Sequence, residues 1–489
     1  MELPIVLEPG VGLPLCSQLS NAIKDAISSQ RLTPGQPLPS TRVLSESLGI
    51  SRDTVMRSYE DLAGLGYVRI TVRSGTFVSD DPPSNSRRER PVLQIPAVDT
   101  AVLSQFTKRL LEIPSTGSSA CDMPAINYGA TPASLLPTKT WRQMLAQQCS
   151  PDAPERLMYV AEDFGYRPLR DEMCRYLNRT RGMHCDTDQV AVFSNAQLPL
   201  ALISRTLVDE GDLVAVEEPC HTGAKDYFLS CGARLAYIPI DCEGMMVSEL
   251  AKLEERCKLV YTTPAHQDPT GVAMSMMRRK ALLAWAEKGC DYIVEDGFDS
   301  DYFYKPPRHP ALAAMDTSDK VLHIYSLWKL LFPLVTTASL VVPHSLIPAF
   351  SRVKASVDRE FSMLEHHALT DFLREGHFEK LVHKTRALLQ QRRQSMIFAV
   401  TQTFKKDIEF FGEGGGLHVA IRAKWPLDEQ RVLSCARAAG LPMVSTVGYY
   451  AVTPTPGEYL ISFAMVSEEQ AMPVVQRFAA ELSKLLDGC

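Results

Sequence analysis

The sequence predicts an α/β protein in which a small N-terminal winged helix-turn-helix precedes a larger domain built on a mostly parallel sheet. Three observations lead to this prediction. Two short helical patterns meet at a glycine turn before residue 50. A stretch rich in Pro, Ser, Asn, Asp and Arg, without apolar periodicity, follows at residues 79–96. Beyond it, apolar runs are mostly separated by segments long enough for crossover helices.

Composition narrows the classes of function. The chain has 489 residues, enough for two or three domains, and a formal net charge of −6, so that nucleic acid must meet a local patch and not the whole surface. No apolar run reaches the roughly 18 residues of a membrane helix, and the N-terminus lacks a signal pattern, so we expect a cytoplasmic protein without membrane contact. The 12 Cys show no ligand spacing, and we expect no metal site.

The N-terminal module, residues 1–79, starts with a helix pattern. Its apolar residues recur at every fourth position: Leu15, Leu19, Ile23 and Ile27. Ser40 is suited to cap a second helix that ends at Gly49, and Ser51 can cap a third helix at once. These two helices, joined by a tight turn, predict a helix-turn-helix.

The third helix has one apolar face and one polar face. Val55, Tyr59 and Leu62 form the apolar face. The residues expected to point mostly outward are Arg52, Asp53, Thr54, Arg57 and Ser58. The following "YVRITVRSGTFVS" predicts a β-hairpin, the wing.

This polar face predicts contact with double-stranded DNA. Arg52 near the start of the third helix is the best candidate to read a base in the major groove, whereas Arg42 and Arg73 are placed for phosphates. The predicted DNA-binding residues are Arg42, Ser51, Arg52, Thr54, Arg57 and Arg73. The alternative is a small helical packing unit with solvated charges. The string "LPSTRVLSESLGISRDTVMRSYEDL" with "SGTFV" resembles the GntR-type winged-helix family, which favours DNA binding.

The body contains seven apolar strand candidates: "QVAVFS", "LVAVEE", "ARLAYIPI", "KLVYTTP", "DYIVED", "KVLHIYS" and "ASLVVP". In a parallel sheet, ligands collect at the carboxyl ends of the strands. The polar residues that follow these strands are Gln197, His266, Gln267, Asp296 and Lys329. We expect them to converge on one site.

Lys329 has two interpretations. Its stem can cover apolar surface while the ammonium reaches water. Alternatively, burial lowers its pKa and makes it a nucleophile toward an aldehyde, with Asp296 balancing a protonated pyridine nitrogen. The turn in "SNAQLPLAL" is then placed to receive a phosphate at a helix N-terminus.

Several stretches resemble the MocR-like subfamily of GntR regulators, whose body is a fold type I aminotransferase-like domain. They include "YGATPASLLPTKTW", "TTPAHQDPTGVAMSMMRRKALLAWA", "VEDGFDSDY" and "SLWKLLFP", and the resemblance runs from about residue 13 to the end. It implies a smaller C-terminal α+β subdomain, pyridoxal 5′-phosphate as cofactor, Lys329 as its Schiff-base lysine and Asp296 as partner of the pyridine nitrogen. It places Ala196 and Gln197 at the phosphate.

The chain also departs from that pattern. His221 stands where a tyrosine usually stacks on the cofactor ring, Phe298 replaces a tyrosine that bonds the phenolic oxygen, and Asp268 replaces an asparagine. Thr336 and Leu460 stand at two arginine positions, the second of which clamps the substrate carboxylate in aminotransferases. We nevertheless count His221 and Asp268 among the cofactor-binding residues.

These observations predict a homodimeric transcriptional regulator that is not an enzyme. Its body would sense pyridoxal phosphate or a related amine or amino-acid effector. The expected divisions are a DNA-binding domain at 1–79, a linker at 80–124, a large domain at 125–345 and a small subdomain at 346–489. The alternatives are a working aminotransferase with a DNA-binding head, and a regulator that has lost cofactor binding.

Overall fold

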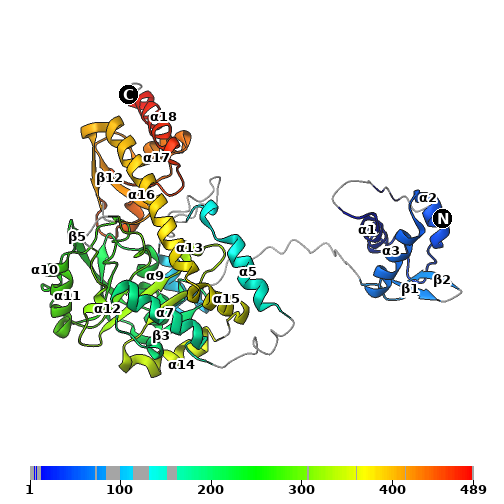
Figure 1. Ribbon diagram of the computed structural model, residues 1–489, viewed down its shortest axis with the longest axis horizontal. Helices are drawn as coiled ribbons and strands as arrows, with labels where there is room; N and C mark the ends of the chain where they lie inside the picture. Colours follow the sequence, from blue (N-terminus) through cyan, green and yellow to red (C-terminus); the bar gives the residue numbers. More distant parts are fainter. Residues whose placement is uncertain are drawn as a thin grey trace. The chain divides into compact units, whose positions relative to one another are not determined.

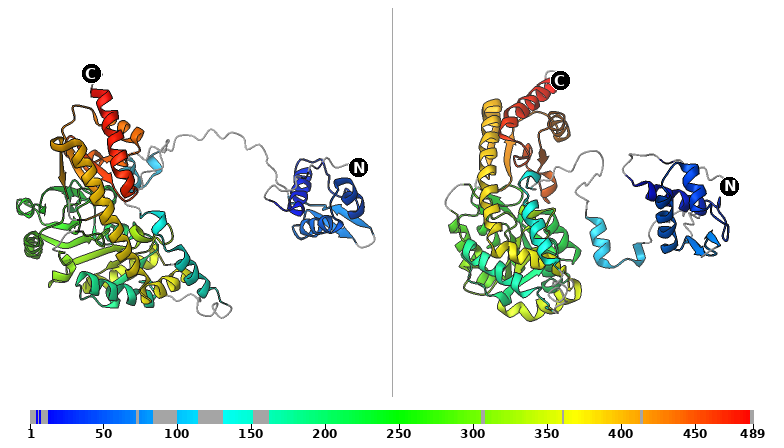
Figure 2. Two further views of the ribbon diagram at one scale, coloured as in Figure 1. Left: turned by 45° about the horizontal axis from the view of Figure 1, so that its top comes forward. Right: turned by 45° about the vertical axis from the view of Figure 1, so that its right-hand side comes forward.

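The computed structural model describes residues 5, 7, 13–71, 74–83, 100–113, 131–150, 162–304, 308–359, 361–412 and 415–486 (Figures 1 and 2). The chain divides into two compact units, Met1–Asp99 and Thr100–Cys489. Over the described ranges, none of the helices combines the length and the apolar character that crossing a membrane requires.

The N-terminal unit has the predicted winged helix-turn-helix. Its described elements are α1 (Leu15–Ser28), α2 (Thr41–Leu48), α3 (Arg52–Gly64), β1 (Val68–Thr71) and β2 (Gly75–Val78), the two strands being antiparallel. The Ser40 side chain accepts a hydrogen bond from the Val43 amide and caps α2, and Ser51 caps α3 in the same way. Gly49 ends α2 with φ 66°, a left-handed conformation in which glycine has no steric penalty.

A single apolar cluster forms the core of this unit. It includes Leu19, Ile23, Leu44, Val55, Tyr59, Leu62, Val68 and Val78. Ser58, expected on the outward side of α3, is buried, and its hydroxyl donates to the Cys16 carbonyl of α1 at 2.9 Å. That expectation was wrong because α1 packs on α3 and covers more of its surface than the apolar stripe alone indicates.

The second unit is built on an eight-stranded sheet in the order β3-β10-β9-β8-β7-β4-β5-β6. The strands are β3 (Val190–Phe193), β4 (Leu213–Glu218), β5 (Arg234–Asp241), β6 (Gly244–Met245), β7 (Cys257–Thr262), β8 (Cys290–Asp296), β9 (Val321–Ser326) and β10 (Ala338–Val341). From β9 through β8, β7 and β4 to β5 the pairing is parallel, whereas β10 and β6 pair antiparallel with their neighbours. All seven predicted strands occur, and the mostly parallel sheet is confirmed.

Helices cover both faces of this sheet (Figure 1). The described helices of this part of the chain are α5 (Thr138–Gln148), α7 (Arg167–Arg181), α8 (Leu198–Leu207), α9 (Thr222–Ser230), α10 (Val247–Leu250), α11 (Met276–Gly289), α12 (Leu312–Met315), α13 (Trp328–Leu331), α14 (Ile347–Val357) and α15 (Met363–Arg374). On β8, Val294 belongs to the same buried cluster as Phe228 of α9, and its neighbour Ile293 to the cluster that contains Leu282 of α11. Successive side chains of a strand point to opposite faces, so one strand serves two cores.

The C-terminal part adds a four-stranded antiparallel sheet in the order β11-β12-β14-β13. Its elements are α16 (His377–Phe404), β11 (Ile408–Phe411), β12 (His418–Ala423), α17 (Glu429–Ala439), β13 (Met443–Ser445), β14 (Glu458–Ser462) and α18 (Glu468–Leu486). Ile461 of β14 is buried in one cluster with Met396 of α16 and Phe478 of α18. On β12, His418 Nε2 lies 2.6 Å from the Pro269 carbonyl oxygen, which joins this sheet to the loop after β7.

The segment predicted as a linker contains a helix. This helix, α4 (Gln105–Glu112), carries Arg109, which forms an ion pair with Glu210 of the body at 2.5 Å. Residues 84–99 and 114–130 on either side lie outside the described residues. The division of the chain at residues 79, 124 and 345 stays a prediction.

Candidate functional site

A cavity of about 600 Å³ lies at the carboxyl ends of β8 and β9. The six predicted cofactor-binding residues all line it: Ala196, Gln197, His221, Asp268, Asp296 and Lys329. They come from five separate stretches of sequence that the sheet brings to one edge. Their role in binding a cofactor stays a prediction. This cavity is called the cofactor pocket below.

Lys329 lies in α13, the short helix directly after β9. Burial lowers the pKa of its amine, and the carboxylates of Asp268, Asp299 and Asp296 act in the opposite direction. Its Nζ lies 5.2 Å from the ring centroid of Phe298. The phenylalanine that replaces the usual tyrosine therefore contacts the lysine with the face of its ring.

Asp296 ends β8 and is held by two donors. The Tyr261 hydroxyl donates to Oδ2 at 2.9 Å, and the Phe298 amide donates to Oδ1 at 3.1 Å. Burial raises the pKa of Asp296, while nearby His221 and the Tyr261 hydrogen bond lower it. A cation beside this carboxylate would favour its ionised form.

Asp268 and His221 also line the cofactor pocket. The Oδ1 atom of Asp268 is buried and has no hydrogen-bond partner among the described residues, and burial raises the pKa of this carboxyl group. His221 caps α9, because its Nδ1 accepts from the Ala224 amide at 3.2 Å. That bond fixes the orientation of the imidazole ring against the pocket.

The predicted phosphate end lies at the N-terminus of α8. Asn195 Oδ1 accepts from the amides of Gln197 at 3.0 Å and Leu198 at 3.2 Å, so a side chain already uses the first donors of this helix. Thr336, at the arginine position, donates its hydroxyl hydrogen to the Ser194 carbonyl at 2.6 Å. Among the described lining residues this end offers only neutral donors.

Leu460 does not line the cofactor pocket. It is buried in β14, on the face opposite to Ile461 and shared with its pairing partner Ala420. In β12, His418 lies on the same face as Ala420 and contacts the loop that follows Asp268. Leu460 therefore belongs to the sheet face turned toward that loop, but it supplies no charge.

His266 and Gln267 do not converge with the others. Gln267 Nε2 donates to the Pro219 carbonyl at 2.7 Å and shapes the loop after β7. His266 lies on a different cavity, with its Nδ1 3.0 Å from Asp299 Oδ1. The expectation of one convergent site was wrong for these two residues, because the chain turns sharply after β7 and aims them away from the cofactor pocket.

The helix-turn-helix presents most of the predicted DNA contacts to solvent. Arg42, Arg52 and Arg57 are exposed, and Arg42 forms an exposed ion pair with Glu46 at 3.5 Å. Ser51 caps α3 by accepting from the Thr54 amide, and the hydroxyl groups of the two residues bond to each other at 2.8 Å. Arg73 lies outside the described residues.

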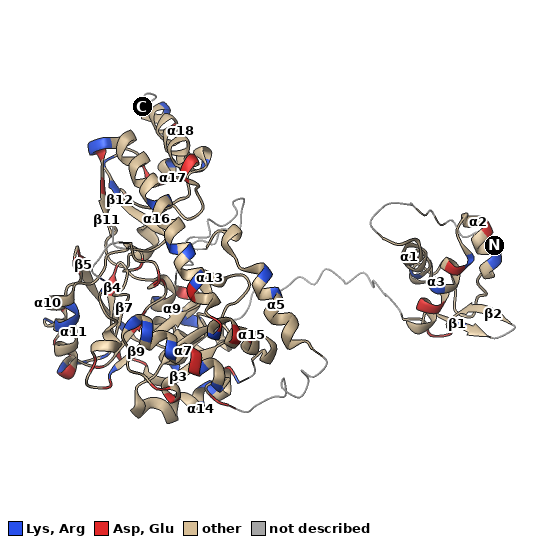
Figure 3. Ribbon diagram, viewed as in Figure 1, with Lys and Arg blue, Asp and Glu red and all other residues tan. Residues whose placement is uncertain are grey.

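Large apolar side chains also reach the surface beside these arginines. Val43 on α2 and Met56 on α3 are 54% and 47% exposed. Sequence periodicity did not select them, because each lies off the apolar stripe of its helix. Across both units, basic and acidic residues are interspersed (Figure 3).

Comparison with known proteins identifies the family. Residues 15–78 match the bacterial regulatory proteins of the gntR family. The chain is 30% identical over 448 residues to the HTH-type transcriptional regulator TauR of Rhodobacter capsulatus, covering 90% of this chain and 91% of that protein. The chain belongs to the MocR-like GntR regulators. It is also 29% identical over 444 residues to the probable rhizopine catabolism regulatory protein MocR of Rhizobium meliloti, covering 89% and 87% of the two chains.

The body of this MocR-like regulator has the fold of aminotransferases. The α-aminoadipate aminotransferase LysN of Thermus thermophilus superposes with a TM-score of 0.70 at 22% identity, covering 80% of this chain and 99% of that chain. Likeness at this identity shows the fold alone. It confirms the predicted fold type I domain.

The sequence pattern did not select Asn195, which lines the cofactor pocket, or Tyr261, which lies outside the lining and donates to Asp296. Tyr261 sits inside the apolar run of β7, where a tyrosine is typical of the core, and Asn195 precedes a helix as a common capping residue. A tyrosine within a fully buried strand indicates that its hydroxyl has a hydrogen-bond partner nearby, because a buried hydroxyl needs one.

Proposed function

We propose that this regulator uses the cofactor pocket to bind pyridoxal phosphate or a related amine or amino-acid effector, and that occupancy controls DNA binding by a homodimer. The observation that carries this proposal is that Lys329 and Asp296 line the same cavity, where burial shifts the pKa of both groups. A scaffold without a ligand would gain nothing from enclosing a lysine and two carboxyl groups at a desolvation cost.

The residues present fit pyridoxal phosphate at its aldehyde and at its ring. Lys329 would hold the aldehyde end and Asp296 the ring nitrogen, and the unpartnered Asp268 Oδ1 is a further polar contact within the pocket. Gln197 and Ala196 would meet the phosphate with neutral donors. When bound, the cofactor supplies an electrophilic aldehyde and an electron-withdrawing pyridine ring.

The protein side of this chemistry follows from burial. Because its pKa is lowered, Lys329 has a larger neutral fraction near neutral pH than an exposed lysine, and the neutral amine is the nucleophile. Tyr261 and the Phe298 amide hold the Asp296 carboxylate by two hydrogen bonds, which supports its charge opposite a pyridinium. Phe298 cannot donate to the cofactor's phenolic oxygen, since it has no hydroxyl.

The proposal includes sensing without efficient turnover. An amino acid must be oriented before its Cα proton can be removed, and orientation contributes about 7 to 11 kcal/mol to such reactions. Leu460 offers no carboxylate clamp, and the described residues that line the pocket include no arginine. An effector that stays bound shifts a conformational equilibrium by its different affinity for two states.

For DNA, we propose that α3 enters the major groove. Arg52 would read a base edge, Arg42 and Arg57 would meet phosphates, and exposed Met56 is suited to contact a thymine methyl group. The ion pair of Arg42 with Glu46 is exposed, so giving it up for a phosphate costs little.

The decisive experiment combines cofactor attachment with DNA binding. Full-length protein is mixed with pyridoxal phosphate, its absorption spectrum is recorded, and borohydride reduction is followed by peptide mapping. We expect one labelled peptide, containing Lys329, and no label in Lys329→Ala. Lys252→Ala serves as the control, because Lys252 is an exposed lysine paired only with Glu249 among the described residues.

DNA binding of both variants is then measured with and without the cofactor. A cofactor-dependent change in wild type and Lys252→Ala, absent in Lys329→Ala, supports the sensor. Label on another lysine, or none at saturating cofactor, would favour a body that serves only as scaffold.

A further inference from the structure

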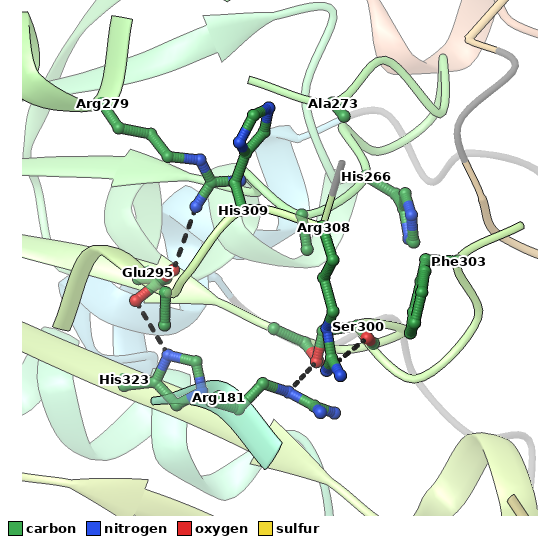
Figure 4. Close-up of a pocket in the computed structure, with 13 residues that line it drawn as sticks. Arg181, His266, Ala273, Arg279, Glu295, Ser300, Phe303, Arg308, His309 and His323 are labelled. Carbon is green, nitrogen blue, oxygen red and sulfur yellow. Dashed lines mark hydrogen bonds and ion pairs between the residues drawn. The ribbon is translucent and has the colours of Figure 1, made fainter. Parts of the chain in front are cut away.

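A second cavity, of about 230 Å³, shares no lining residue with the cofactor pocket, and Figure 4 shows the side chains that line it. The strand β8 separates the two. Asp296 at its end faces the cofactor pocket, whereas the preceding residue, Glu295, lines the second cavity. The alternation of side chains along a strand produces this division.

The second cavity carries more positive than negative charge. Three arginines line it together with one carboxylate, that of Glu295. Arg181 is paired with Asp301 at 2.6 Å, and Arg279 lies 3.9 Å from Glu295. Each of these two guanidinium groups therefore has a buried acid as its partner.

Arg308 has no such partner within the described residues. Its Nη2 donates to the Ser300 carbonyl at 3.4 Å, and its guanidinium carbon lies 4.7 Å from the Phe303 ring centroid. Arg181 donates to the hydroxyl of the same Ser300, so two guanidinium groups lie on one side of the cavity (Figure 4). Desolvation and the like charge of Arg181 lower the pKa of Arg308 to about 10.

His323 gives a second, independent indication of a ligand. Its side chain is 1% exposed, its Nδ1 lies 2.9 Å from Glu295 Oε2, and its buried Nε2 has no hydrogen-bond partner among the described residues. Because the pKa of Glu295 is lowered by His323 and Arg279 against its burial, the carboxylate accepts and Nδ1 carries the proton. Nε2 is left for a group inside the cavity.

We propose that this cavity is a binding site for a small oxyanion of the phosphate or sulfate type, held between the Arg308 guanidinium and Nε2 of His323. Arg308 lines the cavity and is also exposed to solvent, so a ligand can reach the cavity beside this side chain. A Cβ atom at Gly297 would lie 3.0 Å from His323 Cε1, so glycine there allows the imidazole to approach β8.

Size and charge together select this class of ligand. Small-molecule sites for drug-sized compounds usually exceed about 300 Å³, and this cavity is smaller. An oxyanion accepts several hydrogen bonds in little space and relieves the repulsion between Arg181 and Arg308. Hydrogen phosphate also fits either form of His323, since it can donate to a neutral Nε2 or accept from a protonated one.

The test uses isothermal titration calorimetry on two arginine variants of the full chain. It measures the dissociation constants of inorganic phosphate, sulfate and methyl phosphate at constant ionic strength. Arg308→Gln removes the proposed contact. Arg386→Gln is the matched control, because Arg386 stacks on the same Phe303 ring at 4.3 Å but does not line the cavity. Phosphate that binds elsewhere contributes equally to both variants.

We expect Arg308→Gln to raise the dissociation constant of phosphate about tenfold or more, because it removes one charge-assisted contact. Arg386→Gln should leave this dissociation constant unchanged. If methyl phosphate binds more tightly than inorganic phosphate, the ligand of this cavity is a phosphate monoester. If inorganic phosphate binds more tightly, the ligand is the free ion. Equal effects of the two variants, or no saturable binding that Arg308→Gln removes, would overturn the proposal. In crystals soaked with selenate, anomalous scattering should place the anion beside His323.

Discussion

Substitution of Tyr261 by phenylalanine is the sharpest test of the cofactor pocket. The Tyr261 hydroxyl donates to Asp296 Oδ2 at 2.9 Å, and both groups are buried. The substitution removes this donor and leaves the ring packing in place. The Phe298 amide remains as a donor to the carboxylate.

The expected loss follows from the charge of the acceptor. A hydrogen bond to a charged group contributes about 1.5 to 3 kcal/mol, and the tyrosine donor lowers the pKa of Asp296. Without it, the carboxyl group is less ionised and balances a pyridinium less well. We therefore expect Tyr261→Phe to raise the dissociation constant of pyridoxal phosphate by about 10- to 150-fold.

The assay is a fluorescence or absorbance titration with cofactor, accompanied by thermal unfolding of the unliganded protein. Tyr292→Phe is the control. Tyr292 lies on β8, the same strand as Asp296, is half-buried, and makes no hydrogen bond through its hydroxyl in the described part of the chain. Unchanged affinity in Tyr261→Phe, or an equal loss in Tyr292→Phe, would refute the assignment of Asp296 as the ring partner.

Four further outcomes are expected. In DNA binding, Arg52→Ala should cost about 1 to 3 kcal/mol and relax base preference, whereas Arg42→Ala should weaken all sequences alike and flatten the salt dependence in titrations at several salt concentrations. Covalent attachment of the cofactor should increase as pH rises and level off at a lower pH than for an exposed lysine, because burial lowers the pKa of Lys329; a profile that matches an exposed lysine would contradict this. Loaded protein incubated with amino acids and 2-oxo acids should change its spectrum without turnover, because Leu460 supplies no clamp; rates on the order of 1 per second would establish an aminotransferase. Burial lowers the pKa of His366 to about 3, so the folded protein disfavours the protonated imidazole. The free energy of unfolding should therefore fall between pH 6.5 and pH 3, by up to about 1.4 kcal/mol per pH unit. In His366→Gln, the free energy of unfolding should fall less steeply with pH over the same range.

Local sequence determined the elements and several of their ends. Ser40 and Ser51 cap the helices for which they were predicted, and Gly49 ends α2 in the left-handed conformation. The strands of the large sheet were recognisable as apolar runs. Such signals act over a few residues, because capping, turn conformation and side-chain alternation depend on near neighbours.

Tertiary structure decided which of these residues meet. Asp296 ends β8, Lys329 follows the neighbouring strand β9, and the two share a cavity, whereas His266, which follows β7, lines the other cavity. Ser58 became buried because α1, far away in sequence, packs on α3. Pattern in a single sequence gives no measure of such packing.

By itself, the sequence determined that this chain has a helix-turn-helix, a mostly parallel sheet and a lysine with an aspartate at strand ends. Only the tertiary structure revealed the Tyr261 donor to Asp296 and the cavity that Arg308 and His323 share. The physical reason is range. Hydrogen-bond caps and hydrophobic periodicity are local, whereas desolvation and the pairing of buried charges depend on side chains that folding brings together from distant strands.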